Sequence, residues 1–251
     1  LKALGIIKAA ERYRRELNRP VVPVFWIAGD DHDFIESNHT YLLDRKTAEP
    51  VKAAYTASPA TPIPTASIRL ENAEALEAFK AAVRGALGES DFTGDLYALI
   101  DRCYTPQDTL VSGFAKFLTA LVGKYGLVLF SPGDPAVKWV ATPFLVEIVD
   151  RQDELHRHIS QANSELTSEG YHVQVEKKDR AAYLFCDIDG RTPVMREADG
   201  AFSVGERRFS ADELKDFIRR EPERFSPDVM TRPVMQSWLF PVLSQKGGPS
   251  E

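Results

Sequence analysis

Acidic and imidazole side chains gather in one short segment that directly follows an apolar run of the chain. They are Asp30, Asp31, His32, Asp33, Glu36 and His39, with Asn38 beside the last of them. An imidazole titrates near neutral pH and neighbouring carboxylates favour its protonated form, so such a group can accept and relay a proton. We therefore predict that His32 is a general base or proton relay, oriented by Asp31 or Asp33.

Two other interpretations of this segment remain open. An aspartate can cap the N-terminus of the next helix, although a cap requires one side chain and not six. Carboxylates and imidazoles together also suit Zn, Mn or Fe, which would make the segment the site of a metal-dependent hydrolase. Residues 37–40 lack the glycine that the Gly-Asn-His turn of metallophosphoesterases requires, so we assign no metal ligands. If the residues after Asp31 are helical, His32, Glu36 and His39 share one face and both imidazoles can enter one pocket.

The apolar run before this segment, residues 21–28, is rich in β-branched and aromatic side chains and ends at Gly29. This pattern predicts a strand covered on both faces in a parallel sheet, with Pro23 near an edge or near the start of the strand. Residues 127–130 predict a second strand, and helical patterns lie between the two. The order of the elements indicates an α/β layer architecture, in which ligands bind at the carboxyl ends of the strands.

Helical patterns dominate the first two thirds of the chain. Residues 1–17 have amphipathic spacing, and residues 134–170 predict a helical stretch that is interrupted at Pro143. Residues 45–70 are rich in proline and predict an irregular crossing, with a short strand at residues 67–70. The helix start signals are Asn72 before residues 73–87, Thr105-Pro106 with Asp108, and Asp134-Pro135.

The sequence period changes after Gly170. Residues 172–209 contain short strand candidates punctuated by Asp189-Gly190 and Asp199-Gly200, which are signals of tight hairpins. Ser210 begins a capping box that opens a charged helix. We therefore divide the chain into an α/β core with helical connections (residues 1–170), a small antiparallel β insertion (171–210) and a helical return to the core (211–251).

Composition and charge argue against several classes of function. The 251 residues include 37 Asp and Glu against 31 Lys and Arg, a net charge of −6, and the basic residues are scattered, so we expect no nucleic-acid partner. We see no apolar run long enough to span a bilayer and no signal segment, so we expect no membrane partner. Cys103 and Cys186 lie far apart beside apolar residues, as expected of buried hydrophobic groups in a reducing cytoplasm.

Four segments, in order along the chain, are similar to one known family. The first reads Pro-Val-Phe-Trp-Ile-Ala-Gly-Asp-Asp-His-Asp-Phe over residues 23–34 and continues with Glu36 and Asn38-His39. The others are Leu-Phe-Ser-Pro at 129–132 with Asp134 and Lys138, the Asp189-Gly190 hairpin, and a last segment from residue 226 to residue 249. That last segment holds Ser-Pro-Asp-Val at 226–229, Arg232-Pro233-Val234, Gln236, Pro241 and Gly247-Gly248-Pro249. The chain resembles the BshC family, the cysteine-adding enzymes of bacillithiol biosynthesis.

The resemblance implies a Rossmann-like parallel-sheet core and a ligase-type enzyme that joins cysteine to the amine of glucosaminyl malate through an activated carboxylate. ATP is the candidate activating nucleotide by family analogy alone, because the chain has no Walker-type loop and no Gly-x-Gly-x-x-Gly after a strand. Asp31 stands where the family usually has Glu. The family's glycine-rich N-terminal segment and its C-terminal coiled coil, through which the full-length proteins form homodimers, are missing from the sequence. We therefore expect an internal piece of a longer protein that is inactive by itself.

Forming an amide requires a base for the amine and donors for the developing oxyanion. Arg232 can bind a malate-like carboxylate through two nitrogens, or it can make an ordinary ion pair. The backbone at Gly247-Gly248 can approach an anion, or it can form a turn. A non-catalytic core that binds a ligand or partner is the alternative function. The predicted substrate contacts are Asp30, Asn38, His39, Arg232, Gln236, Gly247 and Gly248.

Overall fold

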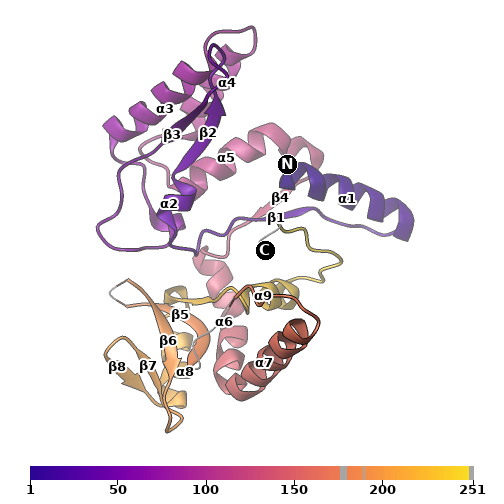
Figure 1. The fold of residues 1–251 in the computed structure, drawn as a ribbon, viewed down its shortest axis with the longest axis vertical. Helices are drawn as coiled ribbons and strands as arrows, with labels where there is room; N and C mark the ends of the chain where they lie inside the picture. The colour runs from indigo at the N-terminus through magenta and orange to yellow at the C-terminus, as the bar shows by residue number, and fades with distance from the viewer. Residues whose placement is uncertain (176–179, 189, 249–251) are drawn as a thin grey trace. The chain divides into compact units, whose positions relative to one another are not determined.

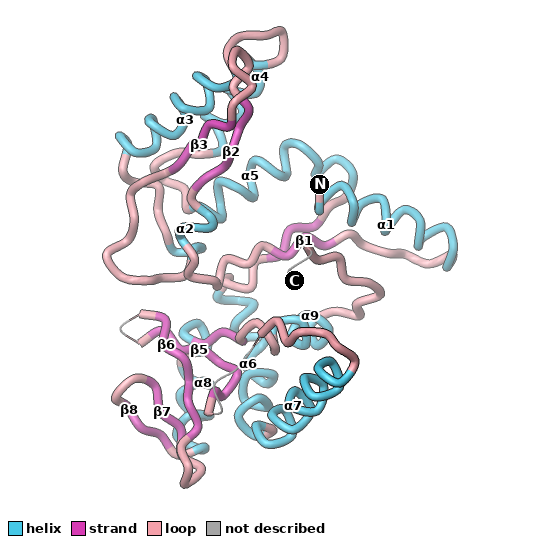
Figure 2. The backbone as a smooth tube through the Cα atoms, in the orientation of Figure 1, coloured by secondary structure: helices cyan, strands magenta, loops and turns pink. Residues whose placement is uncertain are grey.

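The computed structural model describes residues 1–175, 180–188 and 190–248. The chain divides into two compact units, Leu1–Gly133 and Asp134–Glu251, each with its own sheets and helices (Figure 1, Figure 2). Parallel and antiparallel strands alternate with helices, so the α/β class predicted from the sequence is confirmed. The first unit contains α1 (Lys2–Leu17), β1 (Val24–Trp26), α2 (Phe34–Ser37), β2 (His39–Leu43), β3 (Pro50–Ala54), η1 (Thr65–Ser67), α3 (Ala73–Leu87), α4 (Thr93–Cys103), α5 (Leu110–Val122), η2 (Gly123–Tyr125) and β4 (Val128–Phe130).

β1 and β4 pair as parallel strands, with Val24 opposite Val128 and Trp26 opposite Phe130. β1 is shorter than the apolar run that predicted it, because Pro23 before it has no N–H to donate to a ladder. The parallel pairing is confirmed, and the three residues of β1, which point alternately to the two faces, are half-buried, so each face is only partly covered. The apolar core around this strand pair consists of Ala3, Ile7, Val122 and Leu127, with Phe25, Leu118 and Leu129 packed against it.

A β-hairpin that the sequence did not predict follows α2. β2 and β3 pair antiparallel, with His39 opposite Ala54 and Leu43 opposite Pro50, where we expected an irregular crossing. Neither strand alternates apolar and polar residues cleanly, and α3 covers the hairpin. The strand expected at residues 67–70 is reduced to one β-bridge between Arg69 and Thr109.

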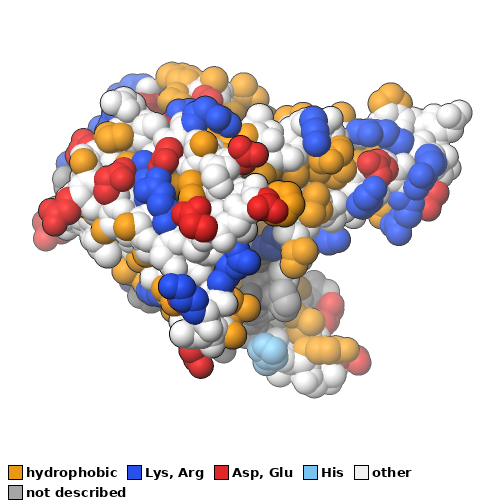
Figure 3. Space-filling model, turned by 90° about the horizontal axis from the view of Figure 1, so that it is seen from above, with side chains coloured by type: hydrophobic (Ala, Val, Ile, Leu, Met, Phe, Trp, Pro, Cys, Tyr) orange, Lys and Arg blue, Asp and Glu red, His pale blue; other side chains and the backbone are white. Residues whose placement is uncertain are grey.

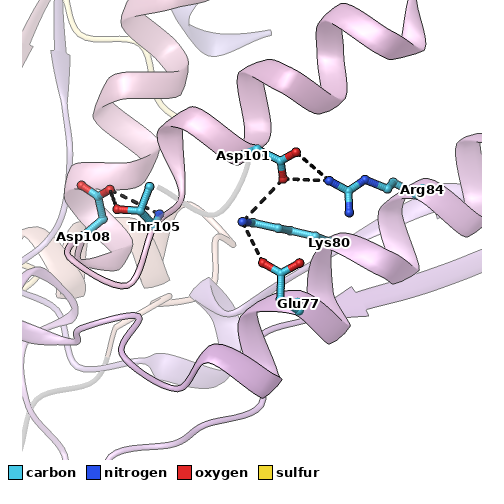
Figure 4. Close-up of polar contacts among 6 residues, drawn as sticks. All are labelled: Glu77, Lys80, Arg84, Asp101, Thr105 and Asp108. Carbon is cyan, nitrogen blue, oxygen red and sulfur yellow. Dashed lines mark hydrogen bonds and ion pairs between the residues drawn. The ribbon is translucent and has the colours of Figure 1, made fainter.

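Three helices complete the first unit. Asn72 caps α3 as predicted, since its Oδ1 accepts from Ala75 N at 3.0 Å. α5 begins four residues later than the Thr105 signal indicated, behind a capping box made by Thr109 and Ser112. α4 was not predicted. Lys80 of α3 is only 6 % exposed, and Figure 4 shows it reaching Asp101 of α4, 3.5 Å from Nζ to Oδ1.

The second unit contains one antiparallel sheet and its helices. The strand order in the sheet is β8-β7-β6-β5-β9. The Asp199-Gly200 hairpin between β6 and β7 is confirmed, whereas Asp189 of the other predicted turn lies outside the described residues. Ser210 caps the next helix in a capping box with Glu213, also as predicted. The elements are α6 (Pro135–Asp150), α7 (Gln152–Ser168), β5 (Ala181–Asp187), β6 (Arg191–Arg196), β7 (Phe202–Val204), β8 (Arg207–Phe209), α8 (Ala211–Arg220), η3 (Pro222–Arg224), β9 (Phe225–Pro227) and α9 (Arg232–Leu239).

α6 continues through Pro143 without interruption, which corrects the sequence prediction. Proline inside a helix costs about 3 kcal/mol, but burying a large apolar side chain recovers roughly 1.5–3 kcal/mol. Several such side chains on α6 are buried, so packing outweighs the lost hydrogen bond. They are Phe144, Leu145, Ile148 and Val149. The helical stretch instead breaks at Arg151, between α6 and α7.

Candidate functional site

The carboxyl ends of β1 and β4 lie beside η1 in the first unit. Ile27 N donates to Phe130 O at 2.8 Å, which continues the pairing one residue past β1. A Cβ on Gly29 would lie 3.0 Å from Ala66 Cβ, and one on Gly133 would lie 3.1 Å from the same atom. A side chain at either position would therefore press against Ala66 of η1, and glycine lets the two loops approach it closely. Ala66 N also donates to Gly29 O at 2.9 Å, which fixes the backbone just before the acidic segment.

Asp31 orients His32. Asp31 Oδ1 accepts from the backbone N of His32 at 2.8 Å and lies 3.4 Å from His32 Nδ1. The Asp31 carbonyl in turn accepts from Thr65 N at 2.8 Å, so this turn is anchored to η1. The His32 side chain remains 44 % exposed, whereas Asp30 is buried at 2 % exposure. The His32 imidazole is therefore accessible to solvent and lies beside a carboxylate.

Asp33 has a structural contact that the sequence left open. Its Oδ1 accepts from Glu36 N at 2.9 Å and caps α2, which is a helix of one turn. The orienting carboxylate of His32 is therefore Asp31. Since α2 ends at Ser37, the prediction that His32 and His39 share a helix face is wrong.

Asn38 and His39 hold the start of the hairpin. Asn38 Nδ2 donates to Tyr55 O at 3.0 Å, and Asn38 Oδ1 lies 3.0 Å from His39 Nδ1. The His39 ring also meets the edge of Tyr41, with ring centroids 5.4 Å apart. α2 therefore ends at Ser37, because these contacts place Asn38 and His39 at the start of the pairing between β2 and β3. Substrate contact by either residue stays a prediction.

The remaining predicted contacts belong to the second unit. Arg232 is the first residue of α9 and Gln236 lies one turn later, while Gly247 and Gly248 follow in an irregular segment. Gln236 Oε1 accepts from Gln245 Nε2, which ties that segment to α9. The structure thus brings Asp30 to His39 together in one unit and Arg232 with Gln236 in the other.

Buried polar residues precede α9, and the sequence reasoning assigned them no role. Asp228 is 1 % exposed, and its Oδ1 accepts from Thr231 N at 3.0 Å and from Thr231 Oγ1 at 3.1 Å. Thr231 Oγ1 also lies 2.9 Å from the carbonyl of Tyr183, a residue of β5 with φ of 57°. Lys138, 5 % exposed, donates from Nζ to Phe225 O at 2.7 Å. Asp228, Thr231 and Lys138 all lie within the segments that resemble the BshC family, and that position in the sequence could have identified them as candidates.

Neither cysteine is placed for nucleophilic chemistry. Cys103 and Cys186 are 3 % and 0 % exposed, which confirms the prediction that both are buried. Burial raises the pKa of the Cys186 thiol to about 12, so its reactive thiolate is scarce at neutral pH.

The described residues offer neither a metal-binding cluster nor a membrane-spanning helix. Within the described ranges, no three His, Cys, Asp or Glu side chains are grouped to hold a metal ion. No helix among the described residues is both long and apolar enough to cross a bilayer. Lys and Arg are mixed with Asp and Glu over the face seen in Figure 3.

Comparison with known protein families covers the segment after β1 together with the rest of the chain. The family model "Bacillithiol biosynthesis BshC, N-terminal Rossmann-like domain" matches residues 1–251. The chain belongs to the BshC family. Its curated relatives are named "Putative cysteine ligase BshC" and include those of Bacillus mycoides and Koribacter versatilis.

The identities to these BshC relatives are moderate and extend along nearly the whole chain. The Bacillus mycoides protein is 32 % identical over 262 residues, covering 100 % of this chain and 46 % of the relative. The Koribacter versatilis protein is 33 % identical over 259 residues, covering 99 % of this chain and 46 % of the relative. The chain therefore spans about half the length of the curated relatives it matches.

Proposed function

We propose that this BshC chain carries the Rossmann-like part of a cysteine ligase that joins cysteine to the amine of glucosaminyl malate in bacillithiol biosynthesis. The observation that supports this most is the Asp31–His32 pair, 3.4 Å apart, at the carboxyl end of a parallel strand in a chain of this family. Strand ends are the usual ligand sites of α/β sheets. The names of the relatives support the ligase class, and the amine substrate and the bond formed are part of the proposal.

In the proposed reaction, His32 accepts the proton that the ammonium of glucosaminyl malate loses before its nitrogen attacks the activated acyl carbon of cysteine. The new C–N bond replaces the bond from that carbon to the activating group, which leaves with the electron pair. Asp31 accepts the backbone N–H of His32 and lies 3.4 Å from its Nδ1, so it can hold the imidazole in place for the transfer. Asp30, which precedes them in the chain, is buried at the strand end. Separately, Arg232 stays a predicted contact for a malate-like carboxylate, on the chemistry of its guanidinium group.

The acidic strand end does not fit a nucleotide by itself. Asp30, Asp31 and Asp33 supply acceptors and negative charge, whereas a triphosphate requires donors and positive charge. We therefore derive no step through ATP from these residues.

The decisive experiment measures cysteine-dependent consumption of glucosaminyl malate by the full-length parent protein, with and without nucleotides. Replacing His32→Ala should lower turnover by roughly two to four orders of magnitude, the usual effect of losing a general base. His158→Ala is the matched control, because His158 is another exposed imidazole beside a carboxylate, 3.6 Å from Glu154 on α7. That control should leave turnover unchanged.

Three outcomes would contradict the proposal. Absence of product from the parent protein under every nucleotide condition would favour a non-catalytic binding module. Near-full activity of His32→Asn, which keeps hydrogen bonding but takes no proton near neutral pH, would make His32 a positioning residue. Bound metal detected by elemental analysis would favour the metal-dependent hydrolase, whereas metal-free protein that keeps its activity in chelator would exclude that alternative.

A further inference from the structure

A basic pocket lies in the second unit, and the proposed function gives it no role. Its volume is about 760 Å³, which falls in the range of small-molecule sites. Four guanidinium groups and one carboxylate line it, so the lining is positive although the chain carries a net charge of −6. The charged residues are Arg207, Arg208, Arg220, Glu221 and Arg224.

The arginines come from three different elements. Arg207 and Arg208 begin β8, Arg220 ends α8 and Arg224 ends η3. Residues up to 17 positions apart in the sequence therefore meet at one concave surface. Phe209 and Phe217 form an apolar part of the lining, and their rings stack with centroids 5.8 Å apart.

The guanidinium groups differ in what already holds them. Arg224 is fixed, since Nε lies 2.5 Å from Glu221 Oε2 and NH1 donates to Asp187 O at 2.9 Å. Arg208 forms an ion pair with Asp199. Within the part of the chain that the structure describes, no side-chain ion pair engages Arg207 or Arg220. These two are the groups that can turn to a ligand.

Ordinary structural roles explain only part of this arrangement. β8 is an edge strand, and charged residues protect such edges from pairing with other chains. A cation at the last residue of α8 also complements the helix dipole. Neither role requires the side chains from β8, α8 and η3 to converge on one pocket.

We propose that this pocket binds a small molecule carrying at least two anionic groups, phosphate or carboxylate. Guanidinium forks bind both kinds of group through paired N–H donors, so the two sources share one recognition chemistry. Arg224 provides a fixed donor in the pocket lining. Arg207 of β8 and Arg220 of α8 donate to the anion from two other sides. The neighbouring phenylalanines accommodate the apolar part of the ligand.

Calorimetric titration of the 251-residue chain with pyrophosphate and with citrate tests this proposal. We expect binding of at least one of the two at low ionic strength, weakening as salt increases. Arg207→Gln and Arg220→Gln should each raise the Kd about tenfold, which is the usual loss for one charge-assisted contact. Both side chains are exposed, so the fold should be retained.

Arg219→Gln is the matched control, because it removes the same charge from the same helix. Arg219 lies outside the pocket lining and pairs with Asp216 at 2.8 Å, so its replacement should leave the Kd within twofold. Preference for pyrophosphate over citrate, or the reverse, identifies the anionic group. Equal losses in Arg219→Gln and Arg220→Gln, or no binding of either anion by the unaltered chain at millimolar concentration, would overturn the proposal.

Discussion

Asp108 is a buried carboxylate whose charge should stabilise the first unit measurably. It is 4 % exposed, and its Oδ1 lies 2.6 Å from Lys116 Nζ. Thr105 Oγ1 donates to Oδ2 at 2.7 Å, a contact drawn in Figure 4, and Ser112 Oγ donates to Oδ1 at 2.8 Å. Burial by itself would raise the pKa of Asp108, but these donors outweigh it and lower the pKa from 3.8 to about 2.

The size of the effect follows from this pKa difference. One pKa unit corresponds to about 1.4 kcal/mol, so a shift of nearly two units contributes roughly 2 kcal/mol to the free energy of unfolding. The unfolded state binds the proton first as the pH falls, since its carboxyl has the higher pKa. The contribution is therefore complete above about pH 5 and is lost as the pH falls toward 2.

The perturbation is Asp108→Asn, measured by urea unfolding at neutral pH and near pH 2.5. Trp26 is the tryptophan of the first unit, so its fluorescence reports on that unit in a Trp139→Phe, Trp238→Phe background. We expect a loss of roughly 2 kcal/mol at neutral pH. The difference between variant and parent should fall by more than half near pH 2.5.

Lys116→Met is the matched control for Asp108→Asn. Lys116 is 53 % exposed, and its removal leaves the two hydroxyl donors on Asp108, so it should cost less than Asp108→Asn. A stability for Asp108→Asn within about 0.5 kcal/mol of the parent at neutral pH would refute the reasoning, because surface substitutions alone stay within that range. So would a loss of equal size at both pH values.

Two further predictions concern the strand end and the thiols. Gly29→Ala should destabilise the first unit by roughly 1–3 kcal/mol in the same assay, since the added Cβ would lie 2.9 Å from Val111 Cγ2. Gly85→Ala is the control: it lies in α3 with nothing within 4 Å of the added Cβ, so it should be neutral or stabilising. Equal effects of the two substitutions would contradict the close approach at Gly29. Cys186 and Cys103 should stay unmodified by maleimide in the folded chain at pH 8 and react in urea, as intact mass spectrometry would reveal. Rapid labelling of the folded chain would show that the burial is wrong.

Local signals in the sequence were sufficient for several elements. The Asn72 cap of α3, the Ser210 capping box of α8 and the Asp134-Pro135 start of α6 lie where they were expected. A cap or helix start is satisfied by backbone groups two or three residues away, so its energy is set almost entirely by neighbours in the chain. The family motif around His32 could also be identified from the sequence, because its residues form one continuous segment.

Other features depended on groups distant in the sequence. α6 passes Pro143 because its buried face recovers more free energy than proline costs. His39 lies in β2 and not in the predicted helix, because Asn38 donates a hydrogen bond to Tyr55, 17 residues later, and β2 pairs with β3. The arginines from β8, α8 and η3 share one pocket only through the folding of the second unit. The sequence by itself determined the capped helix starts and which family the chain resembles. Long-range burial and pairing decided the hairpin after α2 and which side chains meet.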